Sequence, residues 1–196
     1  MSWDERYSAD HYIYGTDPND FLAENIGLFP RGKVLCLADG EGRNGVYLAS
    51  QGFQVTSVDG SGVALQKARA LADKNGVEIE FIQADLNDYD IGTEVWDGIV
   101  SIFCHVPEPL RQKLHAGVVR GLKSGGVLLQ EAYIPRQLEY NMGGPPTVDL
   151  MYSAEILRND LTGLQFNRLA ELDRQVIEGT HHFGKGAVVQ VIATKP

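Results

Sequence analysis

The sequence predicts an α/β protein, a three-layer sandwich in which a mostly parallel, seven-stranded sheet lies between two layers of helices. Short apolar runs of strand length alternate with segments of helical periodicity, which is typical of parallel strands joined by crossover helices. The last two apolar runs are neighbours along the chain and are joined by a short glycine-containing turn, so we expect them to form an antiparallel hairpin. The 196 residues fit a single domain, spanning residues 1–196, that can bury a core.

Helix boundaries in the first half of the chain are predicted from their end residues. Pro18 is acceptable in the first turn of a helix, so Asp17-Pro18 is expected to open one. Ser61 is a suitable N-cap, and Gly76 a suitable C-terminal glycine, for a helix with one apolar face. The expected elements are helix Asp17–Leu28, strand Lys33–Ala38, helix Gly42–Gln51, strand Gln54–Val58, the Ser61–Gly76 helix and strand Glu78–Ala84.

The second half of the chain continues the alternation and then departs from it. Leucine and valine recur every four residues in Pro107–Leu122, which predicts a helix packed on the sheet. The segment Pro135–Met151, with Gly143-Gly144-Pro145-Pro146, is a long irregular loop of the kind that often covers a site. The other expected elements are strands Val95–Phe103 and Val127–Tyr133, helix Ser153–Asp160, and strands Arg168–Glu178 and Ala187–Thr194 joined by Gly179–Gly186.

Charge and cysteine content restrict the partners of the chain. It has 17 basic and 26 acidic residues, a net charge of −9, and no basic patch, so a phosphate backbone would be repelled. We therefore expect no nucleic-acid partner. A modified base that is presented as a substrate within a larger complex remains an alternative. Cys36 and Cys104 lie in apolar runs, which suits a reducing cytoplasm rather than a disulfide framework. With no secretory signal and no apolar run of roughly 20 residues, we expect a cytoplasmic protein and no membrane partner. The sequence gives no indication of the oligomeric state.

A glycine-rich turn follows the first strand directly. Gly40, Gly42 and Gly45 have the spacing G-x-G-x-x-G, which lets the backbone turn tightly and approach a ligand. Asp59 ends the second strand 19 residues after Gly40, where a carboxylate can accept hydrogen bonds from both hydroxyls of an adenosine ribose. The strand, turn, helix and acid together predict a nucleotide-like ligand.

Two features separate the possible ligands NAD and S-adenosylmethionine (AdoMet). Asp85, after the third strand, can accept from an adenine amino group, but both ligands have one. About 30 residues precede the first strand, whereas a dinucleotide-binding domain usually begins with it. The final hairpin adds one reversed strand to an otherwise parallel sheet. Both features favour AdoMet, and an NAD-dependent oxidoreductase is the alternative.

These motifs resemble those of the class I AdoMet-dependent methyltransferases from about Pro30 to the C-terminus. The resemblance implies a Rossmann-like sheet with strand order 3-2-1-4-5-7-6, strand 7 antiparallel, and AdoMet as the cofactor. The motifs that carry it are the Ala38–Gly45 turn, Asp59, Ala84-Asp85-Leu86, Ile102-Phe103-Cys104-His105 and Lys123-Ser124-Gly125-Gly126.

Two further motifs are similar to those of bacterial tellurite-resistance and thiopurine methyltransferases. They are Gly40-Glu41-Gly42-Arg43-Asn44 and the N-terminal Trp3 with Tyr14-Gly15-Thr16-Asp17-Pro18. This branch implies a small-molecule acceptor and a helical N-terminal segment, residues 1–30, that acts as a lid over the substrate.

One position departs from the family pattern. Where the family usually has an acid before the glycine turn, this chain has Cys36. Asp39, three positions later, could contact the methionine ammonium group, or could bond only the neighbouring backbone amides. The departure also leaves open a non-catalytic AdoMet-binding module.

The donor site is expected beyond the carboxyl ends of the strands, as in other open parallel sheets. The residues that the motifs place there are Ala38, Asp39, Gly40, Gly42, Asn44, Asp59, Gly60, Ala84, Asp85, Leu86 and Phe103.

Methyl transfer needs alignment of donor and acceptor more than a particular catalytic group, because the cofactor carries the activated methyl. If a base is used, His105, His181 and His182 are the candidates, since histidine titrates near neutrality. Alternatively, His105 caps the following helix, and the other two are exposed turn residues. Cys104 could be a nucleophile but is more typical of apolar filler. We expect no metal site. The predicted acceptor-side residues are Tyr7, Tyr14, Cys104, Glu131 and Tyr133.

Overall fold

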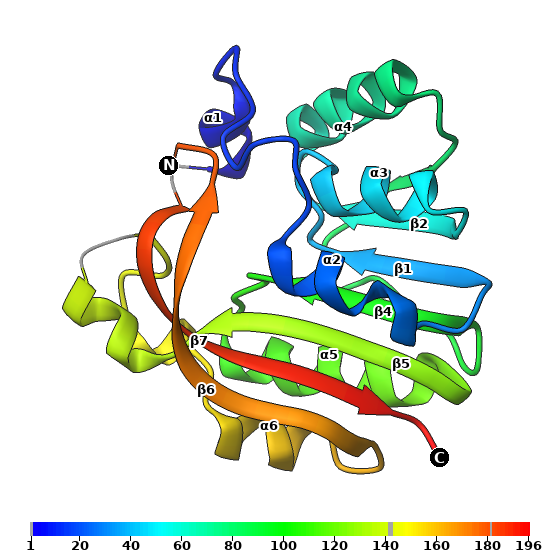
Figure 1. The fold of residues 1–196 in the computed structure, drawn as a ribbon, viewed down its shortest axis with the longest axis vertical. Helices are drawn as coiled ribbons and strands as arrows, with labels where there is room; N and C mark the ends of the chain where they lie inside the picture. Colours follow the sequence, from blue (N-terminus) through cyan, green and yellow to red (C-terminus); the bar gives the residue numbers. More distant parts are fainter. Residues whose placement is uncertain (1, 141–142, 181) are drawn as a thin grey trace.

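The computed structural model describes residues 2–140, 143–180 and 182–196 (Figure 1). Its single sheet has the order β3-β2-β1-β4-β5-β7-β6, which confirms the predicted order. Strands β1 to β5 pair in parallel, and β7 is antiparallel to both β5 and β6. The strands are β1 (Lys33–Leu37), β2 (Gln54–Asp59), β3 (Glu80–Gln83), β4 (Trp96–Ile102), β5 (Leu122–Tyr133), β6 (Gln165–Glu178) and β7 (His182–Thr194).

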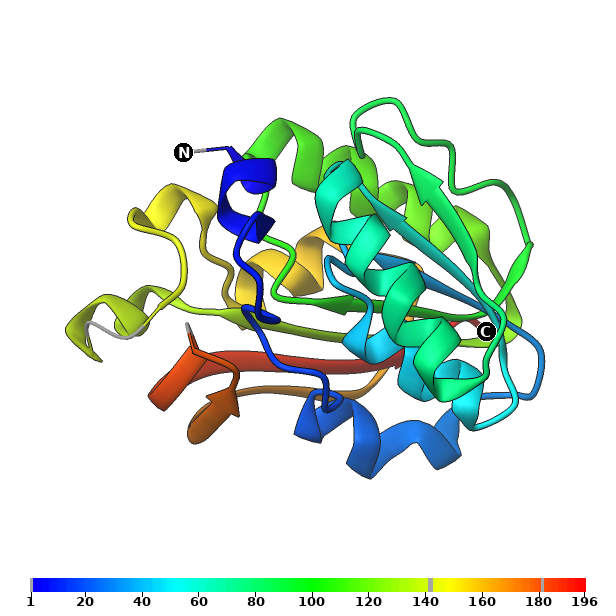
Figure 2. The same ribbon diagram turned by 90° about the horizontal axis from the view of Figure 1, so that it is seen from above.

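Helices cover both faces of the sheet (Figures 1 and 2). Alternation along β1 shows how the two cores are divided, because successive side chains of a strand point to opposite faces. Val34 and Cys36 pack with α2 (Asp20–Asn25) and α3 (Arg43–Ser50). Leu35 and Leu37 belong to the core that also contains side chains of α5 (Glu108–Gly121) and α6 (Ala154–Asp160). No helix among the described residues is long and apolar enough to span a membrane.

Local capping explains which predicted helix boundaries are observed. Helix α4 (Gly62–Asn75) is bounded as expected: the Ser61 hydroxyl accepts from the backbone of Ala64, and Gly76 is left-handed, with φ 65°. The first predicted helix starts later than expected. Asn19 is its N-cap, accepting from Leu22 N–H at 3.0 Å, so α2 begins at Asp20 and continues as the 3₁₀ turn η1 (Ile26–Leu28).

The C-terminal hairpin is longer than its sequence indicates. Strand β6 starts at Gln165, and Glu178 pairs with His182 at the start of β7, so the predicted connection Gly179–Gly186 was too long. Glycines normally weaken strand assignments, but here Gly184 and Gly186 continue the antiparallel ladder. The hairpin therefore reaches the carboxyl edge of the parallel strands.

Two irregular segments reach the same edge. The N-terminal helix α1 (Trp3–Tyr7) begins with a capping box, in which Ser2 N–H donates to Glu5 at 2.6 Å. The segment after β5, predicted as a long irregular loop, contains two 3₁₀ turns, η2 (Pro135–Tyr140) and η3 (Val148–Leu150). Both segments lie next to the point where β1, β2 and β4 end (Figure 1).

Candidate active site

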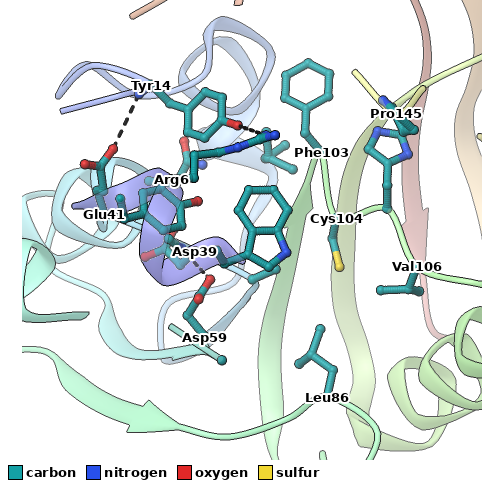
Figure 3. Close-up of a pocket in the computed structure, with 18 of the residues that line it drawn as sticks. Arg6, Tyr14, Asp39, Glu41, Asp59, Leu86, Phe103, Cys104, Val106 and Pro145 are labelled. Atoms are coloured by element: carbon teal, nitrogen blue, oxygen red, sulfur yellow. Dashed lines mark hydrogen bonds between the residues drawn. The ribbon is translucent and has the colours of Figure 1, made fainter. Parts of the chain in front are cut away.

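A cavity of about 530 Å³ opens at the carboxyl edge of the parallel strands. Figure 3 shows the carboxylates of the glycine turn and β2 on one side, and the apolar side chains that follow β4 on the other. The structure brings most of the predicted site residues to this cavity. Those that line it are Tyr7, Tyr14, Ala38, Asp39, Gly40, Asn44, Asp59, Gly60, Ala84, Asp85, Leu86, Phe103, Cys104, His105 and Tyr133.

Two predicted site residues, Gly42 and Glu131, do not line the cavity, and the side chains of two others are not described. Gly42 is the left-handed N-cap of α3, and a Cβ there would lie 2.7 Å from that of Ala68, so the glycine serves close packing. Glu131 is fully buried behind the cavity, where it accepts hydrogen bonds from Arg174 and Gln190. His181 lies outside the described residues, and of His182 only the backbone is described, as the first residue of β7.

Asp59 is held by the turn that it faces. Its carboxylate accepts from the backbone N–H groups of Gly40 and Ser61, both at 2.8 Å. Burial raises the pKa of Asp59, and the two amide donors oppose that rise by stabilising the charged form. Each carboxylate oxygen has two lone pairs. Both oxygens of Asp59 can therefore accept a further hydrogen bond from a ligand hydroxyl on the cavity side.

Asp39 links the glycine turn to the start of α3 and to β2 through hydrogen bonds of its buried carboxylate. Its carboxylate accepts from Gly45 N–H at 3.2 Å and from the Ser57 hydroxyl at 2.9 Å. Burial raises its pKa to about 7, so near neutrality the group is partly protonated. Asp39 was predicted either to contact the methionine ammonium group or to bond neighbouring backbone amides. The observed hydrogen bonds correspond to the second role. Cys36 is 1% exposed within an apolar cluster and supplies no carboxylate.

Arg43 is a site residue that the sequence reasoning named only as part of a motif. Its Nη2 donates to Glu178 at 2.6 Å, while Nη1 is buried without a hydrogen-bond partner among the described residues. The side chain lines the cavity and begins helix α3. A cation in the first turn of a helix opposes the helix dipole, and this was the signal in the sequence that an anionic partner is needed. A ligand carboxylate would satisfy Nη1.

Glu41 was likewise missed as an anchor of the N-terminal segment. Its Oε2 accepts from Ile13 N–H at 2.7 Å, and it forms an ion pair with Lys67 of α4. The Lys67 ammonium also donates to three backbone carbonyls of the N-terminal segment, at Tyr7, Ala9 and His11. Tyr7 then lies over the glycine turn, because a Cβ on Gly40 would come within 2.7 Å of its hydroxyl.

Three rings form the other side of the cavity. Phe103, left-handed with φ 53°, stacks on Tyr133 with centroids 4.5 Å apart. The His105 ring is nearly parallel to that of Tyr133, at 5.8 Å and 11°. A left-handed conformation is rare for a bulky residue and needs support from its surroundings. The stack supplies such support and turns Phe103 toward the cavity.

Both ring nitrogens of His105 are engaged with the backbone. Nε2 accepts from Tyr133 N–H at 3.2 Å, so Nδ1 carries the proton and donates to the Leu150 carbonyl at 2.9 Å. The N-cap of α5 is Pro107, so His105 does not cap that helix. These contacts join the end of β4 to β5 and η3, and they occupy the lone pair that a general base would use.

Cys104 is a buried side chain at the edge of the cavity. Burial raises the pKa of its thiol to about 12, so the reactive thiolate is scarce at neutral pH. Its carbonyl accepts from the Tyr152 hydroxyl at 2.8 Å, which fixes the chain after β4. The environment is that of apolar filler rather than of an activated nucleophile.

The strand order, the glycine turn and Asp59 together define the class I AdoMet-dependent methyltransferase fold. A family model described as a methyltransferase domain matches residues 34–126. Residues 34–126 thus match a methyltransferase domain, which confirms the resemblance seen in the motifs.

Known proteins similar to this chain carry methyltransferase names. The uncharacterized methyltransferase YbaJ of Bacillus subtilis is 32% identical over 65% of this chain and 48% of its own length. A tRNA (uracil(54)-C(5))-methyltransferase of Pyrococcus furiosus is 31% identical over 54% of this chain and 24% of its own length. The chain thus spans half or less of the length of these relatives.

Solved structures share the fold at low identity. One, described for the conversion of a disulfide bond into a thioacetal group during echinomycin biosynthesis, has a TM-score of 0.77 at 21% identity, over 98% of this chain and 91% of the other. TehB from Haemophilus influenzae has a TM-score of 0.74 at 20% identity, over 89% of this chain and 61% of the other. At these identities the likeness concerns the fold.

Proposed function

We propose that this protein transfers a methyl group from AdoMet to a small-molecule acceptor. The observation that carries the proposal is the cavity itself, which is lined beside one glycine turn by Asp59 and by Arg43, whose buried Nη1 has no hydrogen-bond partner among the described residues. These groups suit the ribose hydroxyls and the carboxylate of AdoMet. Asp85 is an acceptor for the adenine amino group. When bound, the cofactor supplies an electrophilic methyl on a sulfonium centre.

Acidic groups gather on the donor side of the cavity. Asp39, Glu41 and Asp59 all line that side, whereas Phe103 and the residues after it are apolar or aromatic. Arg6 and Arg43 line the cavity as well, but carboxylates outnumber guanidinium groups there, and this excess favours a cationic sulfonium ligand over a dinucleotide with two phosphates. This distribution of charge supports AdoMet over NAD.

The acceptor is small because donor and acceptor share one cavity. About 530 Å³ lies within the roughly 300–1,000 Å³ typical of small-ligand sites. The net charge of −9 disfavours an RNA backbone. Some partial relatives are named as RNA methyltransferases, so tRNA belongs among the acceptors to be tested.

The acceptor reaches the site already nucleophilic. Both nitrogens of His105 are engaged, and burial raises the pKa of the Cys104 thiol and of the Tyr7 and Tyr133 hydroxyls. None of these groups is a ready base near neutral pH. Arg6, which lines the cavity and donates to Tyr14 at 3.2 Å, is a cation that can stabilise an anionic acceptor. Thiolates and similar soft anions fit this requirement.

Calorimetric titration with AdoMet, its demethylated product and NAD tests the donor. We expect the first two to bind and NAD not to bind. Asp59→Ala should weaken AdoMet binding by about 1–3 kcal/mol, because a charge-assisted hydrogen-bond acceptor is lost. Asp59→Asn, which keeps the size of the side chain, checks that the turn remains folded. Asp88→Ala, an exposed carboxylate outside the cavity, should leave affinity unchanged.

Turnover is then measured as release of the demethylated product with thiol, phenol, carboxylate and tRNA acceptors. Methylation of a small anion supports the proposal. Binding of NAD in place of AdoMet would instead indicate an oxidoreductase. Donor binding without turnover across the whole panel would indicate a non-catalytic AdoMet-binding module.

A further inference from the structure

A buried cluster of four charged side chains joins the C-terminal hairpin to the glycine turn. It consists of Arg43 on α3, Glu131 on β5, and Arg174 and Glu178 on β6. The side chains of Arg43, Glu178 and Glu131 are 8%, 3% and 0% exposed. We call it the arginine–glutamate cluster. Residues 34–126, which match the methyltransferase family model, contain only its Arg43.

Glu178 is fixed at both oxygens. Its Oε2 accepts from Arg43 Nη2 at 2.6 Å. Its Oε1 accepts from Asn19 Nδ2 at 2.8 Å and from Arg174 Nη2 at 3.1 Å. Arg174 is held in turn by Glu131, with Nη2 to Oε1 at 2.5 Å. The carboxylate of Glu178 therefore sits at a defined place beside Arg43.

Stability alone is a poor explanation for this arrangement. The free energy needed to remove a buried ion pair from water is about as large as the attraction between its two charges. Apolar residues of similar volume would therefore stabilise the fold equally well. The two guanidinium groups and two carboxylates balance in charge, yet Arg43 Nη1 keeps no hydrogen-bond partner among the described residues. One edge of the Arg43 guanidinium is thus bound to Glu178, the side chain lines the cavity, and Nη1 is its buried nitrogen without a partner among the described residues.

We infer that Glu178 is a positioning residue for donor recognition: it holds the Arg43 guanidinium so that Nη1 meets the carboxylate of the methyl donor. The inference rests on the proposed function. It makes the hairpin, which closes the sheet at its far edge, a part of the donor site. Selectivity for a donor that carries a carboxylate then depends on a residue 135 positions from Arg43 along the chain.

The test compares AdoMet with decarboxylated AdoMet, which lacks only the carboxylate. Calorimetric affinities for both are measured in the wild type and in Arg43→Met, Glu178→Gln and Glu171→Gln. The wild type should prefer AdoMet by about tenfold or more, the scale of a charged hydrogen bond. The preference should vanish in Arg43→Met and fall several-fold in Glu178→Gln. Glu171→Gln, on the same strand but exposed, should keep the wild-type ratio.

The ratio of the two affinities separates positioning from a general loss of structure, which would weaken both ligands equally. An unchanged ratio in Glu178→Gln would overturn the inference. A larger ratio would also overturn it, because Glu178 would then compete with the ligand for Arg43. If Glu178→Gln does not fold, Glu178→Asp replaces it in the test. This variant keeps the carboxylate but moves it away from Arg43 on a shorter side chain, so it should lower the ratio. If the wild type binds neither ligand, the proposed function itself fails.

Discussion

Asp39 is a buried residue whose ionisation affects the stability of the folded state. Its carboxyl group lies beneath the glycine turn, and burial raises its pKa from 3.8 to about 7. The folded protein therefore retains a proton that the unfolded chain has lost between these two pH values. The stabilisation that comes from the protonated form is complete below about pH 4 and is lost as the pH rises through 7.

Replacing Asp39 by asparagine should remove this pH dependence. Asparagine keeps an oxygen for Gly45 N–H and an amide for Ser57 but carries no charge. Between pH 5 and pH 8, the free energy of unfolding of the wild type should fall by about 2–3 kcal/mol relative to the variant. Denaturant unfolding of both proteins at the two pH values measures the difference. Parallel curves for wild type and variant would mean that Asp39 ionises normally.

His105 shows how a residue's chemistry depends on its contacts. On sequence alone it is a histidine at the carboxyl end of a strand, which is a typical place for a base. In the structure its ring spans from Tyr133 N–H to the Leu150 carbonyl. It therefore fixes the segment after β5 against the end of β4, where Phe103 meets the cavity.

At the scale of elements, the N-terminal segment is fastened across the glycine turn. Residues 3–15, which we call the N-terminal strap, contact α4 through Lys67 and the turn through Glu41. Thr180 at the tip of the hairpin donates its N–H to Ile13 at 2.9 Å. The strap thus connects the glycine turn, which lines the cavity, to α4 and to the tip of the hairpin, and we propose that its attachment governs access to the donor side.

Lys67→Met should loosen the strap without unfolding the domain. The variant loses an ion pair and three hydrogen bonds to carbonyls, while its side chain keeps a similar length. We expect faster amide hydrogen exchange in residues 7–13 and about tenfold faster release of the demethylated product, measured by stopped flow. Lys74→Met, on the exposed side of the same helix, is the matched control. Equal exchange in the two variants would show that Lys67 does not hold the strap.

At the scale of the whole molecule, the last strand completes the central core. Strand β7 lies between β5 and β6, and Val188, Val189, Val191 and Ile192 are almost fully buried. Burying each of these side chains contributes roughly 1.5–3 kcal/mol. The four together match the roughly 5–15 kcal/mol stability of a whole domain.

A chain that ends at residue 164 should therefore not fold cooperatively. It retains all of residues 34–126, the part that matches the family model, but exposes the β5 edge and the core beneath β7. Circular dichroism during thermal unfolding should show no sharp transition, and AdoMet should not restore one. A cooperative transition would mean that the hairpin is an addition to a domain that is already stable.

The sheet and many element boundaries could be predicted because their signals are local. Ser61 and Gly76 bound α4 through contacts with residues a few positions away. The alternation of strands and helices predicted a parallel sheet with a final hairpin, and the strand order came from the resemblance to class I methyltransferases. Errors arose where a neighbouring group changed the outcome. Asn19 capped α2, which begins at Asp20 rather than near Pro18, and pairing with β6 kept Gly184 and Gly186 in strand β7.

The sequence by itself determined the fold class and one end of the candidate site, because Gly40 and Asp59 lie at the ends of adjacent strands and their spacing is visible in the chain. Only the tertiary structure decided which charges act together. Arg43 meets Glu178, Glu41 meets Lys67, and His105 meets Leu150, across 135, 26 and 45 positions. Folding brings such partners together, and burial makes their contacts strong and their pKa values unusual. No periodicity in the sequence records those distances, so these pairings emerge only in three dimensions.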